Sequence, residues 1–288
     1  MLALSGGSKS KPIGQVTRGK TAPNRLRQTD VYLAVAHAAQ VRGATGVCVD
    51  LGYGAYPVTT VETLHRLRRL NPGLRVVGVE INRRRVTDAQ PYAEPGLEFR
   101  FGGFNLPLLP GERVSFIRAF NVLRQYDESA VAEALAALAG PLTEGGLIIE
   151  GTCDPPGRLL TFNLFLKQGG ALSRTGFVLA PRLSGLSVDF DPREFRAVLP
   201  KNFIHHAEPG GAVDCFFAAW HASWQAARAL APDARGVFMQ AALRLADGYG
   251  YSLDRRPALL RRGFLCLGAH VLASLSGIVL TSGPNRSR

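Results

Sequence analysis

Two carboxylates and two glycines are the residues whose types and spacing point most directly to chemistry. Asp50 follows a short apolar run, and Gly52 and Gly54 come directly after it. Glycines in such a turn adopt conformations that other residues avoid, and they let a ligand approach the backbone. Glu80 ends the next apolar run, where a carboxylate can accept both hydroxyls of a ribose. Ile81 follows and could lie against an adenine face. The alternative role for Glu80 is to complement a helix dipole.

The glycine turn is compatible with two kinds of nucleotide cofactor, which favour different sequence patterns. A nicotinamide or flavin site favours the pattern G-x-G-x-x-G, but Pro57 occupies the third glycine position. The other pattern is acidic-x-Gly-x-Gly, which Asp50, Gly52 and Gly54 satisfy. A carboxylate before the glycines attracts an ammonium group and repels a pyrophosphate. The sequence therefore favours a nucleoside ligand that carries an ammonium.

These residues must be positioned by an alternation of strands and helices. Apolar runs predict five strands, and residues with helical spacing separate several of them. The strands are expected at 46–50, 75–80, 97–101, 113–118 and 146–151, and the main helices at 25–42, 58–70, 83–90 and 128–139. Such runs are typical of a parallel sheet covered on both faces. Residues 153–157 are too few for a parallel crossover, so the runs 159–165 and 176–180 should add antiparallel strands at one edge. We expect an α/β, doubly wound sheet.

The region from about residue 20 to residue 180 resembles the class I S-adenosylmethionine-dependent methyltransferases, and within them a bacterial group of undefined substrate. Four motifs in order carry the resemblance. They are Val-Asp-Leu-Gly-Tyr-Gly at 49–54, Val-Gly-Val-Glu at 77–80, Arg-Ala-Phe-Asn-Val-Leu-Arg-Gln-Tyr at 118–126, and Gly-Gly-Leu-Ile-Ile-Glu-Gly-Thr at 145–152. The sequence departs from the family at Tyr56, which replaces a third glycine, and in the short turn after residue 151.

The resemblance implies a role for each part of the site. The turn with Tyr53 would lie beside the methionine part of the cofactor, and Glu80 would bind its ribose. The adenine would meet the loop after the third strand, and the sulfonium would face the end of the fourth. The residues concerned are Gly103, Phe104 and Asn105 for the adenine, and Arg118 and Asn121 near the reacting centre. The cofactor carries the activated methyl group, so in-line displacement needs alignment of the acceptor and no catalytic triad.

Basic residues upstream of the first helix could close over the cofactor. Residues 1–22 are expected to be a disordered basic lead-in. Arg25 could pair with the cofactor's carboxylate, because a guanidinium suits that geometry. The alternative is a solvated basic linker.

The net charge of +12 favours polyanionic partners, so RNA is the first expected methyl acceptor and a small molecule the second. Arginine clusters at 66–69 and 83–85 could follow an RNA backbone or form solvated faces. Residues 263–284 lack charged side chains. We expect a buried strand at 263–272 there, with a membrane anchor as the alternative.

Four widely separated cysteines indicate free thiols in a reducing cytoplasm, and no metal site is expected. We expect the methyltransferase domain at 23–200, followed at 201–288 by a helical extension with a final apolar strand on the same domain. The predicted function is S-adenosylmethionine-dependent methyl transfer in the cytoplasm. The alternatives are a non-catalytic S-adenosylmethionine-binding protein and a nicotinamide-dependent oxidoreductase.

Overall fold

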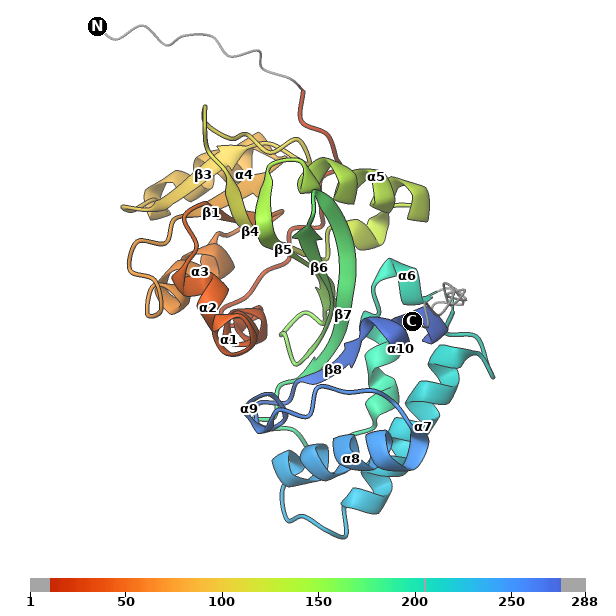
Figure 1. Cartoon of the computed structure of the whole chain (residues 1–288). Coiled ribbons are helices and arrows are strands. Elements are labelled where there is room, and N and C mark those ends of the chain that lie inside the picture. Colours follow the sequence, from red (N-terminus) through yellow and green to blue (C-terminus); the bar gives the residue numbers. More distant parts are fainter. Residues whose placement is uncertain (1–10, 205, 276–288) are drawn as a thin grey trace, which may run out of the picture.

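A single mixed sheet forms the centre of the computed structural model, which describes residues 11–204 and 206–275. Its strand order is β3-β2-β1-β4-β5-β6-β7-β8 (Figure 1). The strands are β1 (Val47–Leu51), β2 (Val76–Glu80), β3 (Leu97–Phe101), β4 (Val114–Phe120), β5 (Leu142–Cys153), β6 (Leu159–Gln168), β7 (Ala171–Pro181) and β8 (Leu265–Gly268). Strands β1 to β5 pair in parallel, and β5 to β8 pair antiparallel. The predicted doubly wound sheet with an antiparallel edge is confirmed.

Helices cover both faces of the parallel part. One face carries α1 (Arg27–Ala36), α2 (Ala38–Arg42), α3 (Val58–Leu67) and α4 (Arg83–Ala89), and the other carries α5 (Glu128–Ala139). Short 3-10 turns, η1 (Gln90–Tyr92) and η2 (Leu123–Gln125), follow α4 and β4. Because both faces are covered, β1 and β2 are buried along their whole length, which explains their continuous apolar sequences.

A tight turn leads from β5 into the antiparallel edge, as the sequence predicts. The Asp154 carboxylate accepts hydrogen bonds from the backbone N–H groups of Arg158 (2.6 Å) and Leu159 (3.1 Å). Gly157 adopts a left-handed conformation (φ 66°) within this turn. Strand β6 then runs back along β5 and forms a long hairpin with β7.

The C-terminal helices pack on this antiparallel edge. They are η3 (Pro192–Val198), α6 (Lys201–Ile204), α7 (Ala212–Ala227), α8 (Ala234–Tyr249), α9 (Pro257–Leu260) and α10 (Ala269–Leu275). Trp220 and Trp224 of α7 are fully buried in a core shared with α8 and strands β6 to β8. The extension therefore shares the sheet of the N-terminal part (Figure 1).

The last apolar segment differs from the expected strand at 263–272. Only Leu265–Gly268 pairs with β7, and Ala269–Leu275 is helical. A short apolar run fits a buried strand and a buried helix equally well, so periodicity alone could not divide the segment. The rest of the segment considered as an anchor, 276–284, lies outside the described residues. Within those residues, no helix combines the length and the apolar character needed to cross a bilayer.

Candidate functional site

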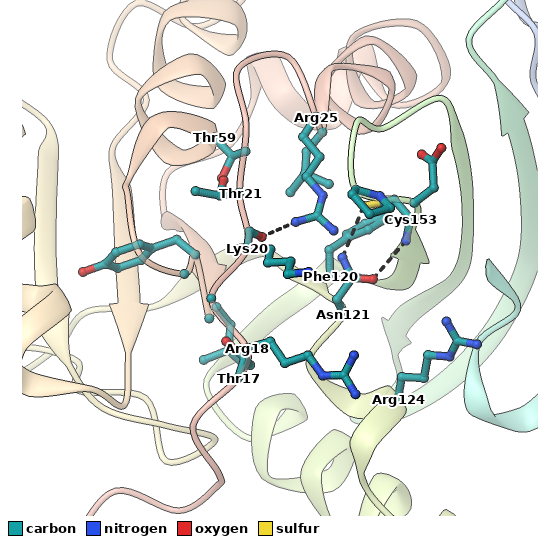
Figure 2. A pocket seen from close by; sticks show the side chains of 18 of the residues that line it. Thr17, Arg18, Lys20, Thr21, Arg25, Thr59, Phe120, Asn121, Arg124 and Cys153 are labelled. Carbon is teal, nitrogen blue, oxygen red and sulfur yellow. Dashed lines mark hydrogen bonds between the residues drawn. The ribbon is translucent and has the colours of Figure 1, made fainter. Parts of the chain in front are cut away.

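A cavity of about 640 Å³ opens at the carboxyl ends of β1, β4 and β5 (Figure 2). The strand order reverses between β1 and β4, which is where open α/β sheets bind their ligands. The cavity is lined by the turn after β1, the ends of β4 and β5, and the segment that precedes α1. A second pocket of about 20 Å³ lies beside it, at the ends of β2 and β3.

The turn after β1 needs its two glycines. Gly52 (φ 70°) and Gly54 (φ 92°) both adopt left-handed conformations. A Cβ at Gly52 would lie 2.7 Å from a methyl of Val122, and one at Gly54 would lie 2.8 Å from the Gly19 carbonyl oxygen. Tyr53, between them, packs edge-on against Phe99. The turn is thus closely packed on both sides.

Asp50 and Arg118 form a buried ion pair beneath this turn. They are direct partners in the β1–β4 register, and the Arg118 guanidinium donates to both Asp50 carboxylate oxygens (2.9 and 2.8 Å). Arg118 also donates to Asp30 of α1 (2.7 Å), which receives a further bond from Arg66 (2.8 Å). Burial raises the pKa of Asp30, and the Arg118 charge opposes that shift. Asp50 lines the large cavity, whereas Arg118 is 2% exposed and does not.

Glu80 lies against the glycine turn. Its side chain is fully buried and accepts hydrogen bonds from the backbone N–H groups of Gly54 and Asn82, both at 3.1 Å. The Arg85 guanidinium lies 3.5 Å from the same carboxylate. Ile81 lines the small pocket beside it. The fold therefore brings together the two carboxyl-terminal motifs of β1 and β2.

The residues predicted to meet an adenine surround the small pocket. Gly103 and Phe104 line it together with Tyr126, whose ring packs edge-on against Phe104. Asn105 follows them, and its side-chain amide bonds to the backbone of the N-terminal segment. The sequence predicts disorder for residues 1–22. Residues 1–10 lie outside the described part of the chain, and residues 11–19 lie across this part of the site. Backbone hydrogen bonds hold them there, and such bonds leave no trace in hydrophobic periodicity.

Asn121 occupies the wall of the large cavity at the end of β4. It has a left-handed backbone (φ 58°), which is rare outside glycine and is held here by neighbours. Its side-chain oxygen accepts from the Cys153 N–H (3.1 Å), and its side-chain nitrogen donates to Cys153 Sγ (3.2 Å) (Figure 2). Burial raises the pKa of the Cys153 thiol. These contacts fix the Asn121 amide against β5.

Arg25 enters the same cavity from the start of α1. It is 8% exposed and donates to the Lys20 carbonyl oxygen. Its buried Nε has no hydrogen-bond partner among the described residues. A buried guanidinium N–H without a partner is costly, so this atom is suited to receive a ligand oxygen.

Several lining residues were not singled out by sequence reasoning. Arg124 and Cys153 line the cavity, and so does the η3 residue Val198. Arg124 lies within the motif at 118–126, which is the signal that could have identified it. Cys153 and Val198 carry no such signal, because their positions depend on the antiparallel edge. In the described ranges, no three or more His, Cys, Asp and Glu side chains are grouped so that they could hold a metal ion.

The arginine clusters expected to follow RNA make contacts within the protein. Arg66 pairs with Asp30 and Glu62, and Arg68 donates to two backbone carbonyl oxygens. Arg83 lies over the Phe101 ring (3.8 Å), and Arg85 pairs with Glu80. The guanidinium groups of these four arginines are therefore committed to the fold. By contrast, Arg69 is exposed, and Arg84, whose side chain is 91% exposed, lies 3.9 Å from Asp88.

No protein-family model matches the chain, and no curated protein matches it. Among solved structures, it is similar to magnesium protoporphyrin IX methyltransferase from Synechocystis PCC 6803 with bound SAH, at 19% identity and a TM-score of 0.34, covering 45% of this chain and 56% of that one. It is also similar to a DUF574 family protein from Streptomyces avermitilis, at 16% identity and a TM-score of 0.36, covering 44% and 52%. The plantazolicin methyltransferase in complex with SAH shows 13% identity and a TM-score of 0.34, covering 45% and 48%.

The chain spans about half the length of these solved structures. Methyltransferases crystallised with SAH are thus among its structural neighbours at low identity.

Proposed function

We propose that the chain is an S-adenosylmethionine-dependent methyltransferase. The observation that carries the proposal is the hydrogen bond between the Gly54 N–H and the Glu80 carboxylate. It joins a carboxylate at the end of β2 to the glycine turn after β1, directly beside a cavity at the switch point of the sheet. This arrangement suits a nucleoside whose ribose meets Glu80 and whose charged tail extends past the turn.

The donors and acceptors of the site fit the two ends of that cofactor. Arg25, with its partnerless buried Nε, is assigned to the methionine carboxylate. Asp50 lines the cavity but already shares its charge with Arg118, so we assign it to holding the turn and to weak attraction of the ammonium. Glu80 retains acceptor capacity beyond its two backbone bonds, which leaves room for a ribose hydroxyl.

When bound, the cofactor supplies an activated methyl group, and the protein must align an acceptor with it and exclude water. Phe120 and Asn121 form the cavity wall at the end of β4 and are assigned to that alignment. Arg118 touches neither cavity, so we assign it a positioning role through Asp50.

We further propose that the acceptor carries a negative charge. Lys20 and Arg124 line the large cavity (Figure 2). Neither side chain pairs with a carboxylate in the part of the chain that the structure describes. Because four of the six arginines in the clusters at 66–69 and 83–85 are engaged within the fold, a small anionic acceptor now stands ahead of RNA. Comparing nuclease-treated and protease-treated extracts with their small-molecule fraction as methyl acceptors separates these classes.

Calorimetry with S-adenosylmethionine, its demethylated product and NAD tests the cofactor. We expect the first two to bind, and Glu80→Gln to weaken both about ten- to hundredfold, because a hydrogen bond to a charged group is lost. Glu133→Gln, on the exposed face of α5, is the matched control and should bind as the wild type does. Equal affinity of the Glu80 variant, or tighter binding of NAD, would contradict the proposal. Binding without methyl transfer to any fraction would identify a non-catalytic binding protein.

A further inference from the structure

An N-terminal strap, residues 11–19, lies across the nucleoside side of the site. Its backbone bonds to residues from four places in the fold, after β2, β3 and β4 and in the glycine turn. The contacts join Ile13 to Phe104 and Asn105, Gln15 to the Tyr126 hydroxyl, Thr17 to Arg85, and Gly19 to Ala55. Apart from Ala55, these partners are residues that line or adjoin the small pocket.

Ile13 offers the pocket one donor and one acceptor side by side. Its N–H donates to Asn105 Oδ1 (2.7 Å), and its carbonyl oxygen accepts from the Phe104 N–H (2.8 Å). The edge of an adenine also presents an amino donor next to a ring-nitrogen acceptor, and proteins read bases through such edges. The backbone N–H and carbonyl group of Ile13 thus bond to the same groups of Asn105 and Phe104 that would bind the edge of an adenine.

The strap is also linked, through Arg85, to Glu80, the carboxylate assigned to the ribose. The Arg85 guanidinium donates to the Thr17 carbonyl oxygen (3.0 Å) and lies 3.5 Å from Glu80. One cation therefore bridges the strap and the residue assigned to the ribose. A ribose that reaches Glu80 must compete with this guanidinium.

The remaining space is too small for a base. With the strap in place the small pocket measures about 20 Å³, which is enough for about one water molecule. Ile13, Gly14, Gln15 and Thr17 of the strap form part of the pocket's lining. The strap lies so close to the loop after β3 that a Cβ at Gly103 would lie 2.0 Å from the Ile13 oxygen. By contrast, the adjoining cavity for the methionine part remains open at about 640 Å³.

We propose that the strap is an internal competitor that occupies the adenine and ribose subsites and must leave before the cofactor binds. This inference rests on the proposed function, since it assigns regulation to the same site. The strap is suited to leave because Ile13 and Val16 are 57% and 52% exposed, so little apolar surface holds it. Gly19 (φ 73°) is bonded to the glycine turn and provides the pivot, and Gly14 (φ 134°) allows the backbone to enter the pocket.

Hydrogen exchange of the full chain tests the proposal, because the two possible roles of the strap change its amide exchange rates in opposite directions. If the strap competes with the nucleoside, saturating S-adenosylhomocysteine should speed exchange of the amides of Ile13 and Gln15. A strap that closes over a bound cofactor would show slower exchange at the same amides. Slower or unchanged exchange in the presence of bound S-adenosylhomocysteine would overturn the proposal.

Calorimetry of strap variants separates this inference from the proposed function. Gly14→Val cannot keep φ at 134° without strain, so it should unseat the strap and tighten S-adenosylhomocysteine binding about tenfold by raising the competent fraction. Gly111→Val makes the same change at a positive-φ glycine remote from the site, and its affinity should not change. Equal, measurable affinity of wild type and Gly14→Val would overturn the competitor alone. Absence of binding to either chain would overturn the cofactor assignment itself.

Discussion

The two halves of the candidate site are built on ends of the same parallel strands, yet they are in different states. The half at β1, β4 and β5 is an open cavity lined by cations, with the buried Arg25 Nε lacking a hydrogen-bond partner among the described residues. The half at β2 and β3 is filled by backbone groups of the strap, which satisfy Asn105 and the Phe104 N–H. A parallel sheet thus provides both subsites, and the chain's own N-terminal segment decides which of them is accessible.

The largest expected effect comes from removing the buried Arg118 guanidinium beneath the open half. Arg118→Met leaves the carboxylates of Asp30 and Asp50 buried without their common partner. Breaking a buried ion pair in this way costs about 3 to 5 kcal/mol, so the free energy of unfolding should fall by that amount in chemical denaturation. Arg255→Met, which breaks an exposed pair with Asp247, should cost less than about 1 kcal/mol. Similar losses in the two variants would show that the buried network does not hold the site.

The next effect concerns Glu150 on β5, the strand that supports the open half. Burial raises the pKa of Glu150 to about 7, and its hydrogen bond from Asn163 opposes part of the shift. Because the folded pKa lies above the ordinary value, the folded state holds a proton that the unfolded chain loses. The protonated Glu150 therefore contributes stability that is fully present below about pH 4.5 and is lost as the pH rises through about 7.

Glu150→Gln should therefore remove a decline in stability of up to about 3 kcal/mol between pH 4.5 and pH 7. Denaturant titrations at several pH values measure it. Glu133→Gln should keep the wild-type pH dependence. If the free energy of unfolding of Glu150→Gln falls with pH as steeply as that of the wild type, a group other than Glu150 causes the decline.

The smallest expected effect distinguishes the two halves most directly, because one substitution in each half should change the cofactor affinity in opposite directions. Arg25→Gln removes the guanidinium assigned to the cofactor's carboxylate in the open half and should weaken S-adenosylhomocysteine binding about tenfold. Arg85→Gln frees Glu80 and the Thr17 carbonyl oxygen in the filled half, and it should tighten binding about threefold. Calorimetry of both variants under one condition measures the pair. Weaker binding in both would mean that the two halves do not differ in accessibility.

The sequence was sufficient where topology alone places residues together. Asp50 and Glu80 lie at the carboxyl ends of β1 and β2, and the loop at 103–105 follows β3. Parallel strands bring their carboxyl ends to one edge. The direction of Arg118 was not predictable, because it depends on the register that sets it opposite Asp50. A shift by one residue would have turned the guanidinium to the other face.

The strap was hidden from sequence reasoning for a different reason. Its hold depends on backbone N–H and carbonyl groups, which every non-proline residue has. Composition then indicates disorder, although the segment is ordered by partners that lie 36 to 111 residues away in the sequence. The short C-terminal strand was overestimated because an apolar run does not record where its partner strand stops pairing.

The pairing of β8 with β7 has a consequence for biosynthesis. The outer side of β7 is covered by a strand that begins at Leu265, whereas β7 itself ends at Pro181. The 83 residues in between (182–264) take roughly 4 to 17 seconds to translate at 5–20 residues per second. During that interval the nascent hairpin has an unpaired, largely apolar edge, which is the kind of surface that aggregates or recruits chaperones.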